Sequence, residues 1–253
     1  MKLTFLGTGT SQGVPVIACG CNVCQSTDYH DVRLRTSALI EHEDSTILID
    51  AGPDFRQQML AAKVKTLDSI LITHEHRDHI AGLDDVRAFN FVQRKPMDIW
   101  AEPRVQEAIR TDYAYVFAEQ KYPGSPEIAL HNIDGLPFNI KKTKIIPIRA
   151  YHYKLPVYGF RIENLTYITD ANFLPEEEKE KIVGSQYLVI NALRKQKHIS
   201  HFSLAEALKL ISELSPRKAF ITHIGHQMGL YADIIKELPE NVSLAYDGLS
   251  IHL

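Results

Sequence analysis

Four side chains of types that bind metals in proteins lie within six residues of one another: His74, His76, Asp78 and His79. The apolar residues 69–73 directly before them predict a buried strand. Because alternate side chains of an extended chain lie on one side, the first two histidines are expected to face the same way. Imidazole and carboxylate ligands suit zinc, manganese or iron. The cluster therefore predicts a metal site; the alternative is a polar surface loop that happens to be rich in histidine.

Three further candidate ligands lie in a matching context, just after predicted strands elsewhere in the chain. They are His152, Asp170 and His223. A single histidine after a strand is more often a structural residue than a ligand. Three such residues in sequence order, after the cluster at 74–79, favour a metal site assembled from several strand ends.

The cysteines form a second cluster of potential ligands. All three, Cys19, Cys21 and Cys24, lie within six residues, which is too close for an ordinary disulfide framework. Thiolates this close repel one another unless a cation neutralises them, and structural zinc takes four tetrahedral ligands. His226, three residues after His223, is the candidate for the fourth ligand. The alternatives are three free thiols or a redox role, and no thioredoxin-like setting supports the latter.

The elements that must position these residues are strands mixed with helices and hairpins. Strands are expected at 2–6, 36–41, 46–50, 69–73, 98–101, 145–149, 158–162, 165–169, 187–191 and 219–222, with two more near the C-terminus. Helices are expected at about 52–62, 103–110, 203–214 (with Ser203 as its cap) and 231–238. The pattern predicts two sheets with helices outside, in one domain spanning 1–253, and an aromatic, irregular rim loop at 113–126.

Composition excludes several classes of protein. The chain has 253 residues, 45% of them hydrophobic, and a formal net charge of -3, so charge gives no argument for nucleic acid or an anionic membrane as a partner. No apolar run approaches the length of a membrane span, and the segment 1–7 is too short and interrupted for a signal peptide. We therefore expect a cytoplasmic location.

The ligand pattern from His74 to His223 resembles the binuclear motif of the metallo-β-lactamase superfamily in order and rough spacing, over essentially the whole chain. The resemblance implies an αββα sandwich of four layers with the site at one edge. It also implies two catalytic divalent ions, zinc or manganese, with a shared carboxylate between them. The implied ligands are His74, His76 and His152 for the first ion, Asp78, His79 and His223 for the second, and Asp170 for both.

One branch of the superfamily is matched more closely. Residues 5–15, the cysteines and the segment 82–85 resemble the branch that contains the phosphoribosyl cyclic phosphodiesterase of the carbon–phosphorus lyase pathway. In that branch three cysteines and a late histidine hold a structural zinc, which implies this role for Cys19, Cys21, Cys24 and His226. The loop at 7–11 also resembles transfer-RNA 3′-processing nucleases, but the cysteines depart from their pattern and no basic arm is inserted.

His201 is the candidate catalytic side chain outside the ligand set. It precedes the helix expected from Ser203, and a helix N-terminus favours an anion such as phosphate. The resemblance implicates a histidine in this region, with His198 as the second choice. The implied mechanism has a hydroxide held between the ions attack phosphorus, while protonated His201 stabilises charge and protonates the leaving group. Asp78 would contribute to catalysis as a ligand and not as the base.

The sequence thus predicts a phosphodiesterase for a small cyclic phosphate or nucleotide-like diester, with no membrane partner and RNA disfavoured. Arg77 and Arg87 could contact the phosphate, although exposed arginines are more often solvated. A thioesterase or lactonase would use the same metal ligands, because the fold is shared across chemistries. A di-iron oxidoreductase, which would need an electron carrier, and a non-catalytic zinc scaffold also fit the ligand types. The substrate, the native metal and the oligomeric state, a homodimer included, stay open.

Overall fold

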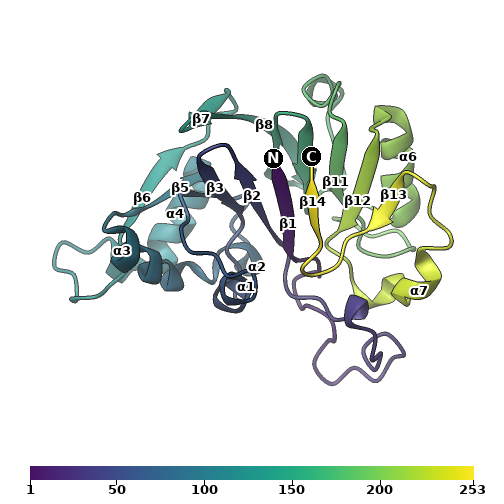
Figure 1. Ribbon diagram of the computed structural model, residues 1–253, viewed down its shortest axis with the longest axis horizontal. Helices are drawn as coiled ribbons and strands as arrows, with labels where there is room; N and C mark the ends of the chain where they lie inside the picture. The colour runs from purple at the N-terminus through teal and green to yellow at the C-terminus, as the bar shows by residue number, and fades with distance from the viewer.

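Two seven-stranded β-sheets form the centre of the computed structural model, which describes residues 1–253 (Figure 1). The strands of the first sheet are, in spatial order, β14 (Ser250–His252), β1 (Lys2–Gly7), β2 (Ser37–His42), β3 (Ser45–Ile49), β4 (Ser69–Leu71), β5 (Met97–Ala101) and β6 (Ile128–Asn132). Those of the second sheet are β13 (Val242–Leu244), β12 (Lys218–Thr222), β11 (Tyr187–Asn191), β10 (Leu165–Ile168), β9 (Leu155–Ile162), β8 (Thr143–His152) and β7 (Phe138–Ile140).

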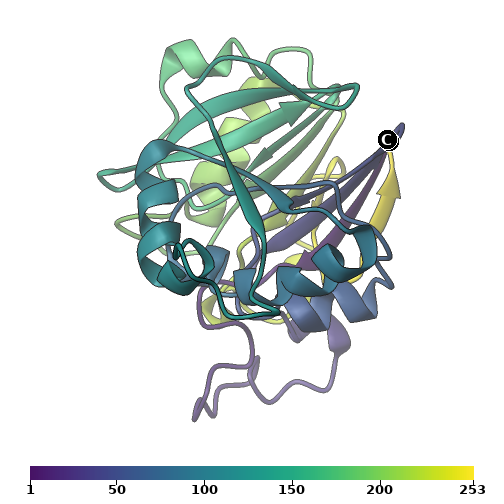
Figure 2. The ribbon, with the colours of Figure 1, turned by 90° about the vertical axis from the view of Figure 1, so that its left-hand side faces the viewer.

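Helices cover the outer faces of both sheets. They are α1 (Phe55–Ala61), α2 (Arg77–Ile80), α3 (Arg87–Gln93), α4 (Pro103–Asp112), α5 (Glu176–Lys179), α6 (Leu204–Leu214) and α7 (Tyr231–Ile234). The blue and teal helices of residues 55–112 lie outside the first sheet, and α6 and α7 lie outside the second (Figures 1 and 2). The layers are therefore helix, sheet, sheet, helix, which confirms the predicted αββα sandwich.

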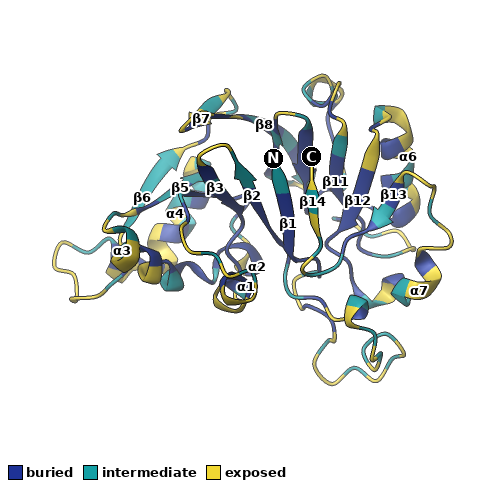
Figure 3. Cartoon of the chain, in the orientation of Figure 1, coloured by how far each residue is buried: buried dark blue, intermediate teal, exposed yellow.

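The alternation of side chains along each strand explains how a sheet packs against the other sheet on one face and against helices on the opposite face. Along β1, Leu3 and Phe5 face the second sheet, and the Phe5 ring lies 5.7 Å from that of Phe220. Leu6 faces the other way, into the cluster that α1 and α4 share with the first sheet. Alternate side chains thus enter different layers, as the pleat requires. Figure 3 shows the result, with buried strands inside and exposed outer surfaces on the helices.

Parallel strands place the candidate ligands at one edge. β3, β4, β5 and β6 run parallel in the first sheet, and β10 to β13 run parallel in the second. In parallel sheets the carboxyl ends of the strands meet at the same edge, where ligand sites are commonly found. The segments after β4, β10 and β12 carry the histidine cluster, Asp170 and His223 respectively.

Some predicted boundaries were wrong. β8 runs to His152 because it pairs with β9 up to the contact of His152 with Leu155, so this histidine ends the strand rather than following it. α7 stops at Ile234 because the next turns form i→i+3 bonds, such as Glu237 N–H to the Ile234 carbonyl at 2.9 Å. The strands β6 and β7 and the helices α2, α3 and α5 were not predicted.

The helix from Ser203 was predicted correctly. The Ser203 hydroxyl accepts a hydrogen bond from the Glu206 backbone N–H, and the Glu206 carboxylate accepts one in return from the Ser203 N–H at 2.9 Å. This reciprocal cap satisfies donors at the start of α6. None of the helices combines the length and the apolar character that crossing a membrane requires.

Candidate metal centre

The histidines of the first predicted group lie close together although β8 is far from β4 in sequence. The ring of His76 lies 4.5 Å from that of His74 and 5.1 Å from that of His152, centroid to centroid. His74 is fully buried, whereas His76 is exposed. The group therefore has one buried side and one side open to solvent.

The second group is more compact. Ligand atoms of Asp78, His79, Asp170 and His223 all lie within 4.8 Å of one another. Asp170 Oδ2 lies 3.2 Å from His79 Nε2 and 3.0 Å from His223 Nδ1. Asp170 also lies within 4.8 Å of ligand atoms of His152 and His201. It therefore stands between the two groups, where a shared ligand would have to be.

The buried polar atoms of the cluster fit divalent ions. Nε2 of His74 and Nε2 of His79 are buried, and neither has a hydrogen-bond partner. Buried polar atoms are nearly always paired, so two buried ring nitrogens without a partner need an explanation. Cations held by nitrogen and oxygen ligands supply one, and this ligand set suits zinc, manganese or iron.

Hydrogen bonds on the far sides of the rings fix their orientation. His79 Nδ1 donates to Asp50 Oδ2 at 2.6 Å, and Asp50 also accepts from the Thr73 N–H at 2.8 Å. His152 Nδ1 donates to the Ser200 carbonyl at 2.8 Å. Such partners aim the other ring nitrogen at a metal. The sequence pattern did not single out Asp50, although this residue ends the strand predicted at 46–50 and the strand-end rule could have found it.

The backbone around the cluster is held in an unusual conformation. Asp50, Asp170 and His223 have φ angles of 62°, 53° and 55°, in the left-handed region. Residues in this region cost roughly 1–3 kcal/mol each and cluster at functional sites. At Gly52, a Cβ atom would lie 2.0 Å from the Asp78 carbonyl, so glycine allows these two segments to touch.

Charge within the cluster is balanced by the histidines. Burial opposes ionisation of Asp170, but His223 and His79 outweigh it and hold the pKa of this carboxyl well below its usual range. Burial also opposes protonation of His79, but Asp78, Asp170 and Asp50 raise its pKa well above the ordinary value. Burial and the neighbouring His79 lower the pKa of His74. The site is thus built to carry anionic carboxylates against positive charge.

The cysteines and His226 form the second predicted constellation. His226 Nδ1 lies 3.3 Å from the sulfur atoms of Cys19 and Cys21 and 3.5 Å from that of Cys24. The Cys24 N–H and then His226 lower the pKa of Cys21 to about 6, whereas burial raises the pKa of Cys24 to about 11. Three sulfurs around one imidazole nitrogen fit a four-ligand zinc site.

The cysteine loop is joined to the main cluster through the backbone. The Ile224 N–H donates to the Thr8 carbonyl at 2.8 Å, and the Thr10 N–H donates to the Ile224 carbonyl at 3.1 Å. Ile224 directly follows His223, so the loop after β1 and the loop that carries this candidate ligand form one bonded unit.

His201 lies in the cluster and His198 lies beside it. The His201 ring is 4.5 Å from that of His152 and 4.9 Å from that of His223, and its Nδ1 atom is buried without a partner. His198 bonds instead with Ser200. Burial, and then the charge of His223, lower the pKa of His201 to about 3. Burial and His223 therefore disfavour the protonated form of this ring in the chain without bound metal.

The side chains that the sequence indicated as possible phosphate contacts have other partners. At the start of α6, which follows His201, the Glu206 N–H donates to the Ser203 hydroxyl and the Ser203 N–H donates to the Glu206 carboxylate. Arg77 pairs with Asp112 at 2.6 Å, and Arg87 pairs with Asp84 at 2.9 Å. These arginines brace the segments beside the cluster.

Comparison with known proteins decides the family. Residues 45–224 match the family model described as "Beta-lactamase superfamily domain". The chain belongs to the metallo-β-lactamase superfamily. It is 33% identical to a solved diphosphatase of the PhnP family, with a TM-score of 0.93, covering 100% of this chain and 97% of that one. Zn²⁺-bound PqqB from Methylobacterium extorquens shares the fold, with a TM-score of 0.83 at 18% identity over 100% of both chains.

Two curated proteins similar to this chain are longer than it is. A protein of Porphyromonas gingivalis (strain ATCC BAA-308 / W83) named octanoyltransferase is 38% identical over 252 residues, 98% of this chain and 51% of its own length. A ribonuclease Z of Geobacillus kaustophilus (strain HTA426) is 28% identical over 167 residues, 64% of this chain and 48% of its own length. The chain thus spans about half the length of these relatives. Its clustered histidine and aspartate side chains are of types that could hold divalent metal ions.

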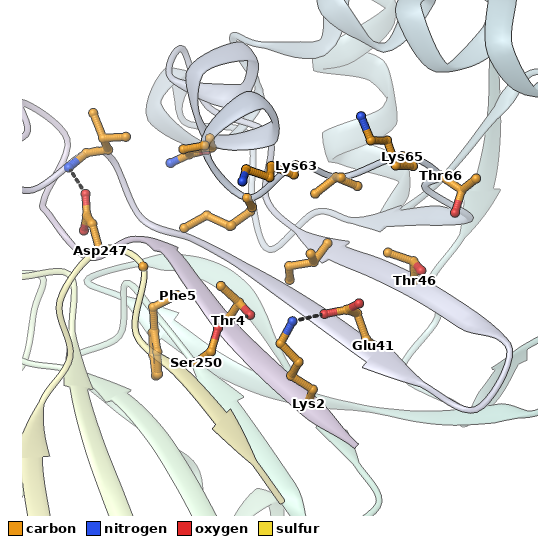
Figure 4. Close-up of a pocket in the computed structure, with 18 residues that line it drawn as sticks. Lys2, Thr4, Phe5, Glu41, Thr46, Lys63, Lys65, Thr66, Asp247 and Ser250 are labelled. Carbon is orange, nitrogen blue, oxygen red and sulfur yellow. Dashed lines mark hydrogen bonds and ion pairs between the residues drawn. The ribbon is translucent and has the colours of Figure 1, made fainter.

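A separate groove lies away from the candidate ligands. It has a volume of about 600 Å³ and lies between the loop after α1 and the outer face of β14, β1 and β2 (Figure 4). Lys63 and Lys65 lie on one side, and the ion pair of Lys2 with Glu41, at 2.7 Å, lies on the other. None of the candidate metal ligands lines it. The groove is therefore not part of the metal centre.

Proposed function

We propose that the chain is a binuclear metal-dependent phosphodiesterase that hydrolyses a small cyclic or nucleotide-like phosphodiester. The observation that carries the proposal is the position of Asp170, which lies within ligand distance both of Asp78, His79 and His223 and of His152 from the first group. The 33% identity with a PhnP-family diphosphatase over the whole chain supports chemistry at phosphorus.

The chain would hold two catalytic ions, zinc or manganese, and one structural zinc. The proposed ligands are His74, His76 and His152 for the first ion, Asp78, His79 and His223 for the second, Asp170 for both, and Cys19, Cys21, Cys24 and His226 for the structural zinc. When bound, the two catalytic ions supply Lewis-acid stabilisation of phosphoryl charge and lower the pKa of water.

The protein's own residues would orient the metal ligands and donate a proton to the leaving group. Asp50 and the Ser200 carbonyl hold His79 and His152 with their Nε2 atoms towards the cluster. His201 offers an unpartnered Nδ1 atom beside both groups. An anionic phosphate against this ring favours its protonated form, so the substrate itself would bring His201 to the state that donates a proton to the leaving oxygen.

A thioesterase or lactonase is the second candidate. The similarity to the octanoyltransferase of Porphyromonas gingivalis favours it, since the name of that protein concerns an acyl group. The chain matches only 51% of that protein, however, so its other half can carry the acyl transfer. A nuclease on RNA ends is the third candidate, supported by similarity to ribonuclease Z over 64% of the chain.

A turnover screen separates the candidates. The chelated chain, reloaded with zinc or manganese, is assayed with cyclic ribose phosphates, 2′,3′-cyclic nucleotides, bis(p-nitrophenyl) phosphate, a diphosphate, an octanoyl thioester and a lactone. We expect turnover of the phosphodiesters by the reloaded enzyme and none by the chelated one. Hydrolysis of the thioester with no phosphodiesterase activity, or equal rates before and after chelation, would overturn the proposal.

A further inference from the structure

Glu75, between two candidate ligands, is anchored by an arginine from another helix. Arg104 lies in the first turn of α4, and its Nη1 atom donates to Glu75 Oε1. Its Nη2 atom donates to the Pro156 carbonyl at 2.8 Å. One guanidinium group therefore holds both the histidine segment of the first sheet and strand β9 of the second.

The strand that Arg104 contacts belongs to the hairpin that carries His152. Pro156 pairs with Tyr151, and the next pair along the hairpin is His152 with Leu155. The Tyr158 N–H, two residues further along β9, donates to the Thr73 carbonyl at 3.0 Å. Arg104 is thus a clamp between the two segments that carry the histidines of the first group.

A row of alternating charges, Glu75, Arg104, Glu102 and Arg149, holds the clamp in place. Arg104 Nη2 lies 3.4 Å from Glu102 Oε2, and Arg149 Nη2 donates to Glu102 Oε1 at 2.8 Å. The Arg149 guanidinium lies 3.8 Å above the centre of the Tyr158 ring. The side chains of Arg104 and Glu75 are only 34% and 23% exposed. A planar guanidinium can serve three diverging acceptors, which a lysine ammonium at this position would match poorly.

The first group depends on such a clamp more than the second group does. His79 in the second group is oriented directly by the Asp50 carboxylate. His76 is exposed and makes no side-chain hydrogen bond in the structure, so its place is set by the backbone on either side of it. On its C-terminal side the His76 carbonyl accepts from the His79 N–H at 2.9 Å. On its N-terminal side the contact of Glu75 with Arg104 anchors the segment.

We propose that Arg104 is a positioning residue for the first metal ion, acting through Glu75 on His76 and through β9 on His152. The proposal rests on the binuclear centre of the proposed function. Residues that support metal ligands without binding the metal typically change metal affinity by about 10- to 100-fold. Arg104 is expected to have an effect of this size on one ion only.

The test measures metal content and affinity by stepwise competition with a chelator, in the wild type and in four variants. We expect Arg104→Gln and Glu75→Gln each to weaken one ion by about 10- to 100-fold, with the other catalytic ion and the cysteine-bound zinc unchanged. Arg104→Lys should recover part of the affinity. Arg110→Gln, on an exposed position of the same helix, is the matched control and should behave as wild type.

A double variant with both Glu75→Gln and Arg104→Gln tests whether Arg104 acts on the metal ligands through Glu75. If the arginine acts through the glutamate, the double variant should lose little more affinity than either single variant. Wild-type affinity for both ions in Arg104→Gln would overturn the inference. So would an equal loss of all three ions together with a lower melting temperature, since that indicates a general structural role. A wild-type chain that binds no ion at the histidines would instead refute the proposed function.

Discussion

The Nδ1 atom of His79 lies 2.6 Å from Oδ2 of Asp50, and both side chains are fully buried. Asp50 also accepts hydrogen bonds from the backbone N–H and the hydroxyl of Thr73. The carboxylate therefore fixes the tautomer of His79 and directs Nε2 into the cluster, where it lies 3.2 Å from Asp170. This contact organises the second group of candidate ligands without occupying any of their metal-facing atoms.

Replacing Asp50 by asparagine should weaken metal binding. The amide keeps the size of the side chain but loses the charge that supports His79 as a ligand, so affinity should fall by about 10- to 100-fold. Chelator competition measures the change, and Asp44→Asn, at an exposed turn, is the control. An unchanged affinity would show that Asp50 does not orient the ligand.

Replacing His201 and His198 one at a time by glutamine should change kcat to different extents. His201→Gln removes a group beside both candidate metal sites and should lower kcat by about 10²- to 10⁴-fold with metal content retained. His198→Gln should have little effect, because this ring bonds with Ser200 at the edge of the cluster. Loss of metal from His201→Gln would make that residue a ligand rather than an acid.

The cysteine constellation should hold one zinc ion per chain. Cys24→Ser removes one of three sulfurs around His226, so zinc content should fall by one equivalent. The loop after β1 would lose its tie to η4 (His226–Met228), and a loss of a few kcal/mol corresponds to roughly 5–10 °C in melting temperature for a chain of this size. Gln25→Ser, at the neighbouring exposed position, is the control. Unchanged zinc content would show that the sulfurs do not bind it.

Asp247 should make stability depend on pH. Burial raises the pKa of this carboxyl to about 6, even though the Leu34 N–H and the Thr8 hydroxyl donate to it. A raised pKa means that the folded state holds the proton more tightly than the unfolded state. Its contribution to stability is therefore complete below about pH 4 and is lost as pH rises to about 6, by roughly 3 kcal/mol.

Urea unfolding of the chelated chain between pH 4 and pH 7 measures this effect. The free energy of unfolding of wild type should fall across this range relative to that of Asp247→Asn, which cannot ionise. Asp233→Asn, at an exposed position, should follow the wild type. Parallel curves for wild type and Asp247→Asn would contradict the assignment.

Most of the candidate metal ligands could be predicted from their positions at strand ends, and there is a physical reason for this. His74, Asp170 and His223 each follow an apolar strand that is buried on both faces and pairs in parallel with a neighbour, and such runs are visible in a single sequence. The strands β6 and β7 were missed because they are short edge elements whose residues are only partly buried. Their hydrogen bonds depend on neighbours that local patterns do not reveal.

The residues that support the cluster were harder to predict. Asp50 ends a predicted strand, but it is not part of a recognisable metal-binding motif in the sequence. Arg104 is one of many charged residues on helices, and its contacts with Glu75 and Pro156 join segments 29 and 52 residues away. Side-chain contacts over such separations follow from how the two sheets pack, and no local periodicity encodes them.

The sequence by itself determined the types of ligand, their order along the chain and the strands that end beside them, because residue identity and periodicity are local properties. The tertiary structure alone decided which ring nitrogens face the cluster, and it placed Asp170 between the two groups. It also buried His201 rather than His198 within the cluster. These outcomes depend on burial and on distances between strands of different sheets, which exist only once the sandwich has formed.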